Sequence, residues 1–173
     1  MKNLVLIGLS GCGKTSLGRR LSRLLRMPLL DTDAMIVEAE GRAISDIFAE
    51  RGEAYFRDLE SAACEAVSER EGVVIATGGG AILREKNMEA LAKNGVIFFI
   101  DRHPAHILRS ASLMDRPLVQ DDRDKLFRLY ADRLPLYRRW ADVTVPNQGS
   151  RRRMARCLRL IVKHFRQSAG QDA

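Results

Sequence analysis

The octapeptide GLSGCGKT, residues 8–15, restricts the fold of this chain more than any other stretch of its sequence. It follows a run of apolar residues at 4–7 and leads into SLGRRLSRLL, in which the leucines recur at helical spacing. A G-x-x-x-x-G-K-T motif between a strand and a helix is the pattern of a phosphate-binding loop. Its glycines allow the backbone N–H groups to turn inward, and the next helix adds its N-terminal dipole. The sequence therefore predicts binding of a nucleoside triphosphate with magnesium.

The residues of this loop have separate expected roles. Lys14 supplies a positive charge for the β- and γ-phosphates, and the Thr15 hydroxyl is placed to bind Mg²⁺. Cys12 is interpreted as a small residue that fits the tight turn. The predicted nucleotide-binding residues of the loop are Gly11, Cys12, Gly13, Lys14, Thr15 and Ser16.

Length and composition indicate a single folded domain over residues 1–173. Of the 173 residues 46% are hydrophobic, which suffices for a full core. No apolar run approaches the roughly 20 residues that span a bilayer, so we expect no membrane attachment. The cysteines, at positions 12, 64 and 157, show neither metal-binding spacing nor a pairing pattern. This usage favours a reducing, cytoplasmic location.

The formal net charge of +7 allows two interpretations. A basic surface can bind nucleic acid, or a pocket for anionic ligands can hold much of the excess charge. The segment 151–166, RRRMARCLRLIVKHFR, has apolar residues at helical spacing and arginines on its other faces. No recognised nucleic-acid-binding motif accompanies it. We interpret it as a solvated C-terminal helix and expect no nucleic-acid partner.

Apolar runs and helical periodicity predict alternating strands and helices. Strands are expected at 3–8, 28–30, 73–76, 95–101 and 142–146. Helices are expected at 15–26, 33–40, 44–51, 53–70, 86–93, 104–110, 124–140 and 150–167. Short strands that alternate with helices form a parallel sheet covered on both faces. We therefore expect an α/β fold built on a five-stranded parallel sheet.

Polar sequences follow the first three predicted strands. The phosphate-binding loop follows the first, DTD at 31–33 the second and TGGG at 77–80 the third. In open parallel sheets, ligands bind beyond the carboxyl ends of the strands. Because Asp31 and Asp33 alternate, we expect one to support the magnesium and the other to reach an acceptor hydroxyl as base or orienter. Asp33 also suits an alternative role as a helix N-cap.

Six motifs taken together resemble the shikimate kinases along nearly the whole chain. They are GLSGCGKT, LLDTD at 29–33, FRDLE at 56–60, TGGGA at 77–81, DRPLV at 115–119 and RLPLYRRWAD at 133–142. The resemblance implies a three-layer P-loop kinase fold of the nucleoside monophosphate kinase type. It also implies a substrate-binding segment at about 31–62 and a mobile lid at about 112–122.

The resemblance assigns nucleotide and metal contacts. It implies that Lys14 contacts the transferring phosphate and that Thr15 binds Mg²⁺ with Asp31 behind it. Arg116, in the lid, would reach both phosphate and substrate. Arg109 would lie near the adenine, as would the loop after Val145. The expected catalytic residues are Lys14, Asp33 and Arg116.

The resemblance also assigns the acceptor site. Asp33 would bind the shikimate hydroxyls, and Arg57 and Arg133 would grip its carboxylate, since a guanidinium donates parallel hydrogen bonds to a planar carboxylate. Backbone N–H groups of three glycines would approach the substrate closely. The expected acceptor residues are Asp33, Arg57, Gly78, Gly79, Gly80 and Arg133. A surface helix pair between Arg57 and Glu60 is the competing interpretation of FRDLE.

The expected reaction is transfer of a phosphoryl group from ATP to the 3-hydroxyl of shikimate, in the chorismate route to aromatic amino acids. We expect ATP and Mg²⁺ as cofactors. We also expect the protein to be a monomer. A gluconate kinase-like or other small hydroxy-acid kinase is the closest alternative. A nucleoside monophosphate kinase is a weaker one. A nucleotide-dependent nucleic-acid-binding module is the alternative from another class.

Overall fold

Five short strands form one wholly parallel sheet. The computed structural model describes residues 1–109, 123–148 and 151–170. The strands are β1 (Asn3–Ile7), β2 (Leu29–Asp31), β3 (Val74–Ala76), β4 (Gly95–Asp101) and β5 (Val143–Pro146). Their order in the sheet is β2-β3-β1-β4-β5, and every pairing is parallel. The predicted five-stranded parallel sheet is confirmed.

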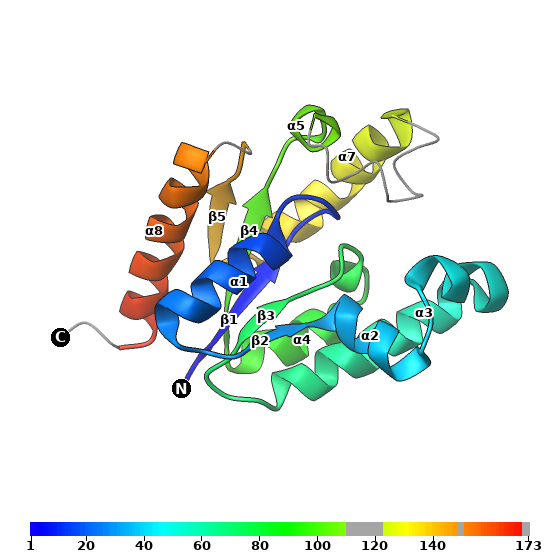
Figure 1. Ribbon diagram of the computed structural model, residues 1–173, viewed down its shortest axis with the longest axis horizontal. Helices are drawn as coiled ribbons and strands as arrows, with labels where there is room; N and C mark the ends of the chain where they lie inside the picture. Colours follow the sequence, from blue (N-terminus) through cyan, green and yellow to red (C-terminus); the bar gives the residue numbers. More distant parts are fainter. Residues whose placement is uncertain (110–122, 149–150, 171–173) are drawn as a thin grey trace.

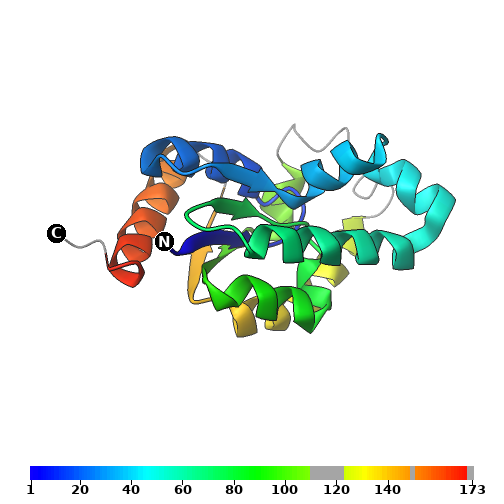
Figure 2. The same cartoon turned by 90° about the horizontal axis from the view of Figure 1, so that it is seen from below.

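The helices cover both faces of this sheet. They are α1 (Lys14–Leu25), α2 (Thr32–Glu40), α3 (Ile44–Ser68), the 3₁₀ helix η1 (Ala81–Leu83), α4 (Glu85–Lys93), α5 (Pro104–Leu108), α7 (Arg123–Trp140) and α8 (Arg151–Ser168). Helices α1 and α8 lie on one face, while α4 and α7 lie on the other (Figures 1 and 2). The three-layer arrangement agrees with the expected P-loop kinase fold.

The central strands are apolar on both sides because helices bury both of their faces. All five residues of β1 and all three of β3 are buried. This is why these strands read as continuous apolar runs and not as an alternation. Phe99 of β4 stacks on Tyr137 of α7, with ring centroids 4.9 Å apart. Among the described residues, no helix has the length and apolarity required to cross a bilayer.

Helices α2 and α3 form a unit with a hydrophobic cluster of its own. Ile36, Ile47, Phe56 and Ala63 are buried together at this contact, apart from the main core. Gly52 interrupts α3 with φ 79° and ψ 172°, a conformation that is open to glycine almost alone. The predicted interruption at Gly52 is confirmed, and it turns the first part of α3 relative to the second.

Five helices, α1, α2, α4, α7 and α8, begin one residue away from the predicted position, and for α1 and α2 the cap explains the difference. Helix α1 starts at Lys14, one residue early, because Gly13 in a left-handed conformation serves as its N-cap. Asp31, and not Asp33, is the N-cap of α2, and its carboxylate accepts from the backbone N–H groups of Asp33 and Ala34. The capping role suggested for Asp33 is therefore wrong. Its side chain is instead in the first turn of the helix, beside the carboxyl ends of β2 and β3.

Candidate functional site

The phosphate-binding loop has the conformation that its glycines allow. Gly8, Gly11 and Gly13 have φ values of 143°, 78° and 105°. A Cβ atom on Gly8 would lie 2.7 Å from the backbone oxygen of Ile100. Strain and crowding thus both require glycine at position 8. The loop closes tightly against the end of β4 and leads directly into α1.

Lys14 places its charge inside this loop. Its side-chain nitrogen donates to the backbone oxygens of Gly8, at 2.7 Å, and Leu9, at 2.9 Å. The residue is only 8% exposed. Within the described residues it forms no ion pair, so its positive charge is not neutralised by a neighbouring carboxylate. Such a cation attracts a phosphate that enters the loop.

Two side chains from the ends of neighbouring strands hold the loop from outside. Asn147, just after β5, donates from Nδ2 to the backbone oxygen of Cys12 at 2.8 Å. Arg102, just after β4, donates to the backbone oxygens of Gly11 at 3.3 Å and His106 at 2.8 Å. Burial lowers the pKa of Arg102. Its buried Nε has no hydrogen-bond partner in the described structure. Arg102 also takes part in none of the ion pairs of the described residues, so it adds a second charge without a paired carboxylate beside the loop.

Thr15 and Asp31 place side-chain oxygens side by side at the mouth of the loop. The Thr15 hydroxyl donates to Asp31 Oδ2 at 2.8 Å, while Oδ1 caps α2. A surface pocket lies here, lined by Thr15, Asp31, Asp33, Ala34, Val37, Glu38 and Ile44. Capping orients the Asp31 carboxylate, and hydroxyl and carboxylate oxygens are the donors that Mg²⁺ prefers.

Arg57 and Glu60 form a buried ion pair, not the surface pair of the competing interpretation. Arg57 Nη1 lies 2.6 Å from Glu60 Oε2, and Nη2 lies 2.9 Å from Glu53 Oε1. The Glu60 side chain is fully buried, and that of Arg57 is 13% exposed. Burial lowers the pKa of Arg57, but the charges of Glu60 and Glu53 outweigh this and raise it overall. Arg57 is therefore held in one orientation and stays charged.

Glu60 is the most buried carboxylate of the site. Burial raises its pKa, and the charge of Arg57 only partly opposes this effect. Its Oε1 has no hydrogen-bond partner among the described residues. A Cβ atom on Gly78 would lie 2.5 Å from this oxygen and 2.7 Å from Asp33 Oδ1. Both carboxylates thus meet at the same glycine.

The glycines at 78–80 are packed between polar side chains. Arg133 Nη1 donates to the backbone oxygen of Gly79 at 3.0 Å, and the Tyr137 hydroxyl donates to it at 2.6 Å. A Cβ atom on Gly80 would overlap Arg57 Nη1. No side chain fits at position 80 unless the guanidinium moves. Residues from three separate segments thus converge on this short turn.

The turn also touches the phosphate-binding loop. A Cβ atom on Gly79 would lie 3.0 Å from the backbone nitrogen of Ser10. The Thr32 hydroxyl accepts from the N–H of Gly78 at 3.0 Å and ties the turn to the start of α2. The structure therefore brings the predicted acceptor residues directly against the predicted phosphate residues.

Several predicted residues lie apart from this convergence or outside the described structure. Arg109 is exposed at the end of α5, and Ser16 is exposed in the first turn of α1. Cys12 is fully buried, which fits its interpretation as a small turn residue. Arg116 and the predicted lid at about 112–122 fall outside the described residues.

Sequence reasoning missed Arg102 and Tyr137 as parts of the site. Arg102 directly follows a predicted strand, a position that is itself a signal because ligands bind beyond the strand ends. Tyr137 lies four residues after Arg133, so one helix face presents both to Gly79. The sequence indicates Glu60 only as a possible helix partner of Arg57, since it does not reveal that Glu60 is buried.

Comparison with known proteins gives one consistent family. A family model described as shikimate kinase matches residues 10–164. A shikimate kinase of Clostridium botulinum (strain Alaska E43 / Type E3) is 40% identical over 151 residues, covering 87% of this chain and 91% of its own length.

Solved structures agree with this result. The shikimate kinase from Acinetobacter baumannii in complex with shikimate superposes with a TM-score of 0.86 and 32% identity, covering 99% of this chain and 95% of its own. A gluconokinase from Sinorhizobium meliloti 1021 covers 96% of this chain and 97% of its own, with a TM-score of 0.51 and 18% identity. That second likeness shows a shared fold alone.

Proposed function

This chain belongs to the shikimate kinase family, and on that premise we propose that it transfers the terminal phosphoryl group of ATP to the 3-hydroxyl of shikimate. The products are shikimate 3-phosphate and ADP, in the chorismate route to aromatic amino acids. The contact between Gly79 and Ser10 is the observation that supports this most strongly. Through this contact, the proposed acceptor pocket would adjoin the phosphate-binding loop.

The nucleotide half of the site follows from the loop. We assign the phosphates to the backbone N–H groups of Gly11, Cys12 and Gly13 and to Lys14, with Ser16 beside them. Phosphoryl transfer depends on positioned charge more than on covalent chemistry by the protein. Lys14, held against the loop carbonyls, provides that charge. Arg109 and the loop after β5 are assigned to the adenine.

The residues present fit a magnesium ion. In the described structure no three or more His, Cys, Asp or Glu side chains gather as a metal site, so the protein alone offers few ligands. Mg²⁺ commonly takes one or two protein oxygens together with substrate phosphates. Thr15 would hold the ion, with Asp31 behind it. The ion would neutralise charge on the phosphates.

The acceptor half follows from the glycine turn. Arg57, which Glu60 and Glu53 keep charged and oriented, is assigned to the shikimate carboxylate together with Arg133. Asp33 is assigned to the hydroxyls, where it orients the attacking oxygen and accepts its proton. The N–H groups of the glycines at 78–80 are assigned to the same bound acid, between the groups that hold its carboxylate and its hydroxyls. Arg116 completes the proposed catalytic set.

The segment around this half is proposed to act as a unit. We assign substrate binding to the α2–α3 region, residues 31–62, and closure over the site to the lid at about 112–122. A closed lid would exclude water and suppress hydrolysis of ATP. A cytoplasmic monomer within one domain, 1–173, completes the proposal.

Four acceptors distinguish this function from its rivals. ADP release would be followed with Mg·ATP and, in separate reactions, shikimate, gluconate, a nucleoside monophosphate, single-stranded nucleic acid or no acceptor. We expect strong stimulation by shikimate alone. Stimulation by gluconate alone would assign the acceptor pocket to another hydroxy acid, and stimulation by nucleic acid would assign the chain to a different class.

A further inference from the structure

Helices α1 and α8 form a face that contains cations and no carboxylates. No Asp or Glu occurs at 14–30 or at 143–170. Exposed arginines and lysines cover the two helices, at 19, 20, 23, 152, 156, 159, 163 and 166. This face therefore contains more positive charge than the whole-chain excess of +7, and the rest of the molecule is net acidic.

The basic side chains of α8 follow one another along a single stripe. Arg152, Arg156, Arg159, Lys163 and Arg166 are spaced alternately four and three residues apart. Like charges at such spacing repel and destabilise a helix. In the described residues, the arginines that form ion pairs lie elsewhere, at 42, 57, 84 and 139. An anionic partner would relieve this repulsion.

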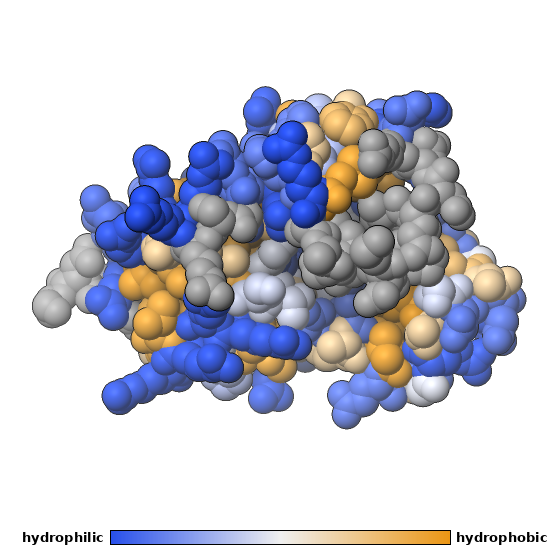
Figure 3. Space-filling model, turned by 45° about the horizontal axis from the view of Figure 1, so that its top comes forward, coloured by the Kyte–Doolittle hydropathy of each residue, from blue (hydrophilic) through white to orange (hydrophobic). Residues whose placement is uncertain are grey.

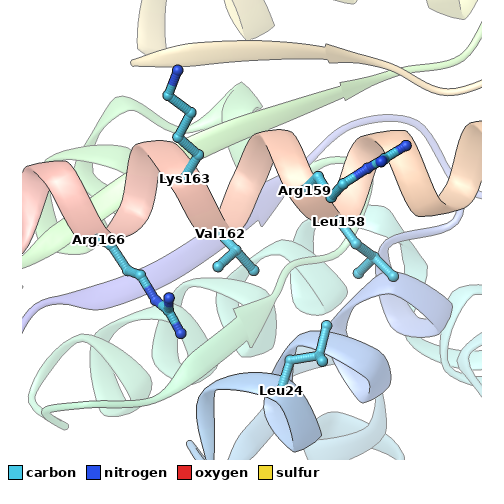
Figure 4. Close-up of a pocket in the computed structure, with 6 residues that line it drawn as sticks. All are labelled: Leu24, Leu158, Arg159, Val162, Lys163 and Arg166. Atoms are coloured by element: carbon cyan, nitrogen blue, oxygen red, sulfur yellow. The ribbon is translucent and has the colours of Figure 1, made fainter. Parts of the chain in front are cut away.

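A groove with an apolar floor runs between the same two helices. It has a volume of about 500 Å³ and is lined by Leu24, Leu158, Arg159, Val162, Lys163 and Arg166. Leu158 and Val162 of α8 point toward Leu24 of α1 (Figure 4). Leu24 is 58% exposed, so apolar surface of the groove is open to solvent. Figure 3 shows hydrophobic surface bordered by hydrophilic side chains at this end of the molecule.

We propose that this groove, the α1–α8 groove, binds an acidic amphipathic helix of a partner protein. The leucines of the partner helix would pack on the apolar floor of the groove, and its carboxylates would pair with Arg159, Lys163 and Arg166. A helix laid into a hydrophobic groove is a common mode of recognition. Complementary charge adds specificity and speeds association.

Two other polyanions fit this surface less well. A nucleic-acid backbone would pair with the cations but has no apolar side chains for the concave floor between Leu24 and Val162. A membrane surface binds protruding apolar residues, whereas these line a hollow. The groove also lies at the carboxyl end of α1, and the phosphate-binding loop lies at its amino end. A docked helix would therefore leave the nucleotide site open.

Binding can be tested with a defined probe. A fluorescent helical peptide with leucines on one face and glutamates elsewhere would be titrated with the full chain by anisotropy. A peptide of the same composition, with the leucines distributed around the helix, is the matched control. We expect the amphipathic peptide to bind saturably, with an affinity at least about tenfold higher than that of the control peptide. This affinity should fall as the salt concentration rises. Absence of binding, or equal binding of both peptides, would overturn the proposal.

Variants locate the binding on the protein. Arg159→Glu with Lys163→Glu, and separately Leu24→Glu, should each weaken peptide binding about tenfold or more while kinase turnover is unchanged. Lys86→Glu with Lys93→Glu changes the same charge on exposed positions of α4 and should have little effect. Circular dichroism would establish that each variant is folded. If both double variants lost the same peptide affinity, the effect would come from net charge alone, and a specific binding groove would be refuted.

Competing partners are part of the same experiment. A single-stranded oligonucleotide and vesicles containing anionic phospholipid would be titrated at the same salt concentration. If either bound more tightly than the amphipathic peptide and lost affinity in the Arg159/Lys163 variant, the partner class proposed here would be wrong. Peptide binding does not require turnover, so this result stands apart from the outcome of the acceptor assay.

Discussion

Single residues at the glycine turn should decide whether the proposed acceptor fits. Gly80 has φ −101°, a value that any residue adopts, so its importance is spatial and not conformational. A side chain at this position would occupy the place of the Arg57 guanidinium. At Gly80 the turn is therefore limited by the available volume and not by the backbone conformation.

Gly80→Ala should displace Arg57 and weaken shikimate binding. We expect the KM for shikimate to rise about tenfold or more, since a charged hydrogen-bonding partner is lost. The KM for ATP should change little. Steady-state kinetics with each substrate varied would measure both.

A double-mutant cycle provides the control for this change. If the alanine acts through Arg57, its effect should nearly vanish in an Arg57→Ala background. Full additivity of the two changes would show that Gly80 acts by another route.

Glu60 should make the stability of the protein depend on pH. Its folded-state pKa is raised by burial above the ordinary carboxyl value of 4.5, so the folded protein binds a proton more readily than the unfolded chain. Its contribution is thus fully present below 4.5 and is lost as the pH rises through the raised pKa. Glu60→Gln cannot ionise and should lack this loss.

Urea unfolding of both proteins over a pH series would measure this effect. The unfolding free energy of the natural protein, relative to Glu60→Gln, should fall as the pH rises through that window and then level off. A difference that is constant with pH would mean that the proton affinity of Glu60 is the same in both states.

At the scale of elements, the junction of β2 with α2 joins two functions in one carboxylate. One oxygen of Asp31 caps α2, and the other accepts from Thr15 of α1. The end of a strand, the start of a helix and the proposed magnesium position are thereby linked.

Substitutions at Asp31 should separate these two functions. Asp31→Ala removes the cap and should lower the unfolding free energy by about 1 kcal/mol. Asp31→Asn retains an oxygen acceptor for the cap, so its stability should stay close to that of the natural protein. It lacks the charge, however, and should need more Mg²⁺ for half-maximal turnover.

Unfolding curves and magnesium titrations of activity would check this. A normal magnesium requirement in Asp31→Asn would remove Asp31 from the neighbourhood of the metal. Equal stability of all three proteins would show that the cap adds nothing measurable.

At the scale of the whole molecule, charge is distributed unevenly. The α1–α8 face is cationic, while the described ion pairs lie elsewhere. Salt largely screens charges that lie farther apart than the Debye length, which is about 8 Å at physiological ionic strength. The stripe from Arg152 to Arg166 is roughly 21 Å long at 1.5 Å per residue, so salt weakens the repulsion between its distant members.

Added salt should therefore stabilise this protein. We expect the unfolding temperature to rise between low and physiological concentrations of sodium chloride. The Arg159→Glu/Lys163→Glu variant, in which attraction replaces part of the repulsion, should show a smaller rise. Calorimetry at a series of salt concentrations would measure both, and a fall with salt in the natural protein would contradict the prediction.

Local patterns in the sequence were sufficient for much of the fold. The glycine loop, the apolar runs and the helical spacing predicted all five strands, and Gly52 predicted the break in α3. These features depend on steric limits and on periodicity within a few residues. The helix starts were predicted less accurately: Asp31, and not Asp33, caps α2 because Asp31 is the residue that directly precedes the helix.

The sequence by itself determined which chemical groups this protein has and that they follow strand ends: a phosphate loop, two aspartates and a glycine turn. Only the tertiary structure decided that Gly79 touches Ser10, that Glu60 is fully buried and that Arg102 supports the loop. Residues far apart in the chain meet through the strand order and through packing of both sheet faces. No local pattern encodes those long-range contacts, because they depend on how all the elements fill space together.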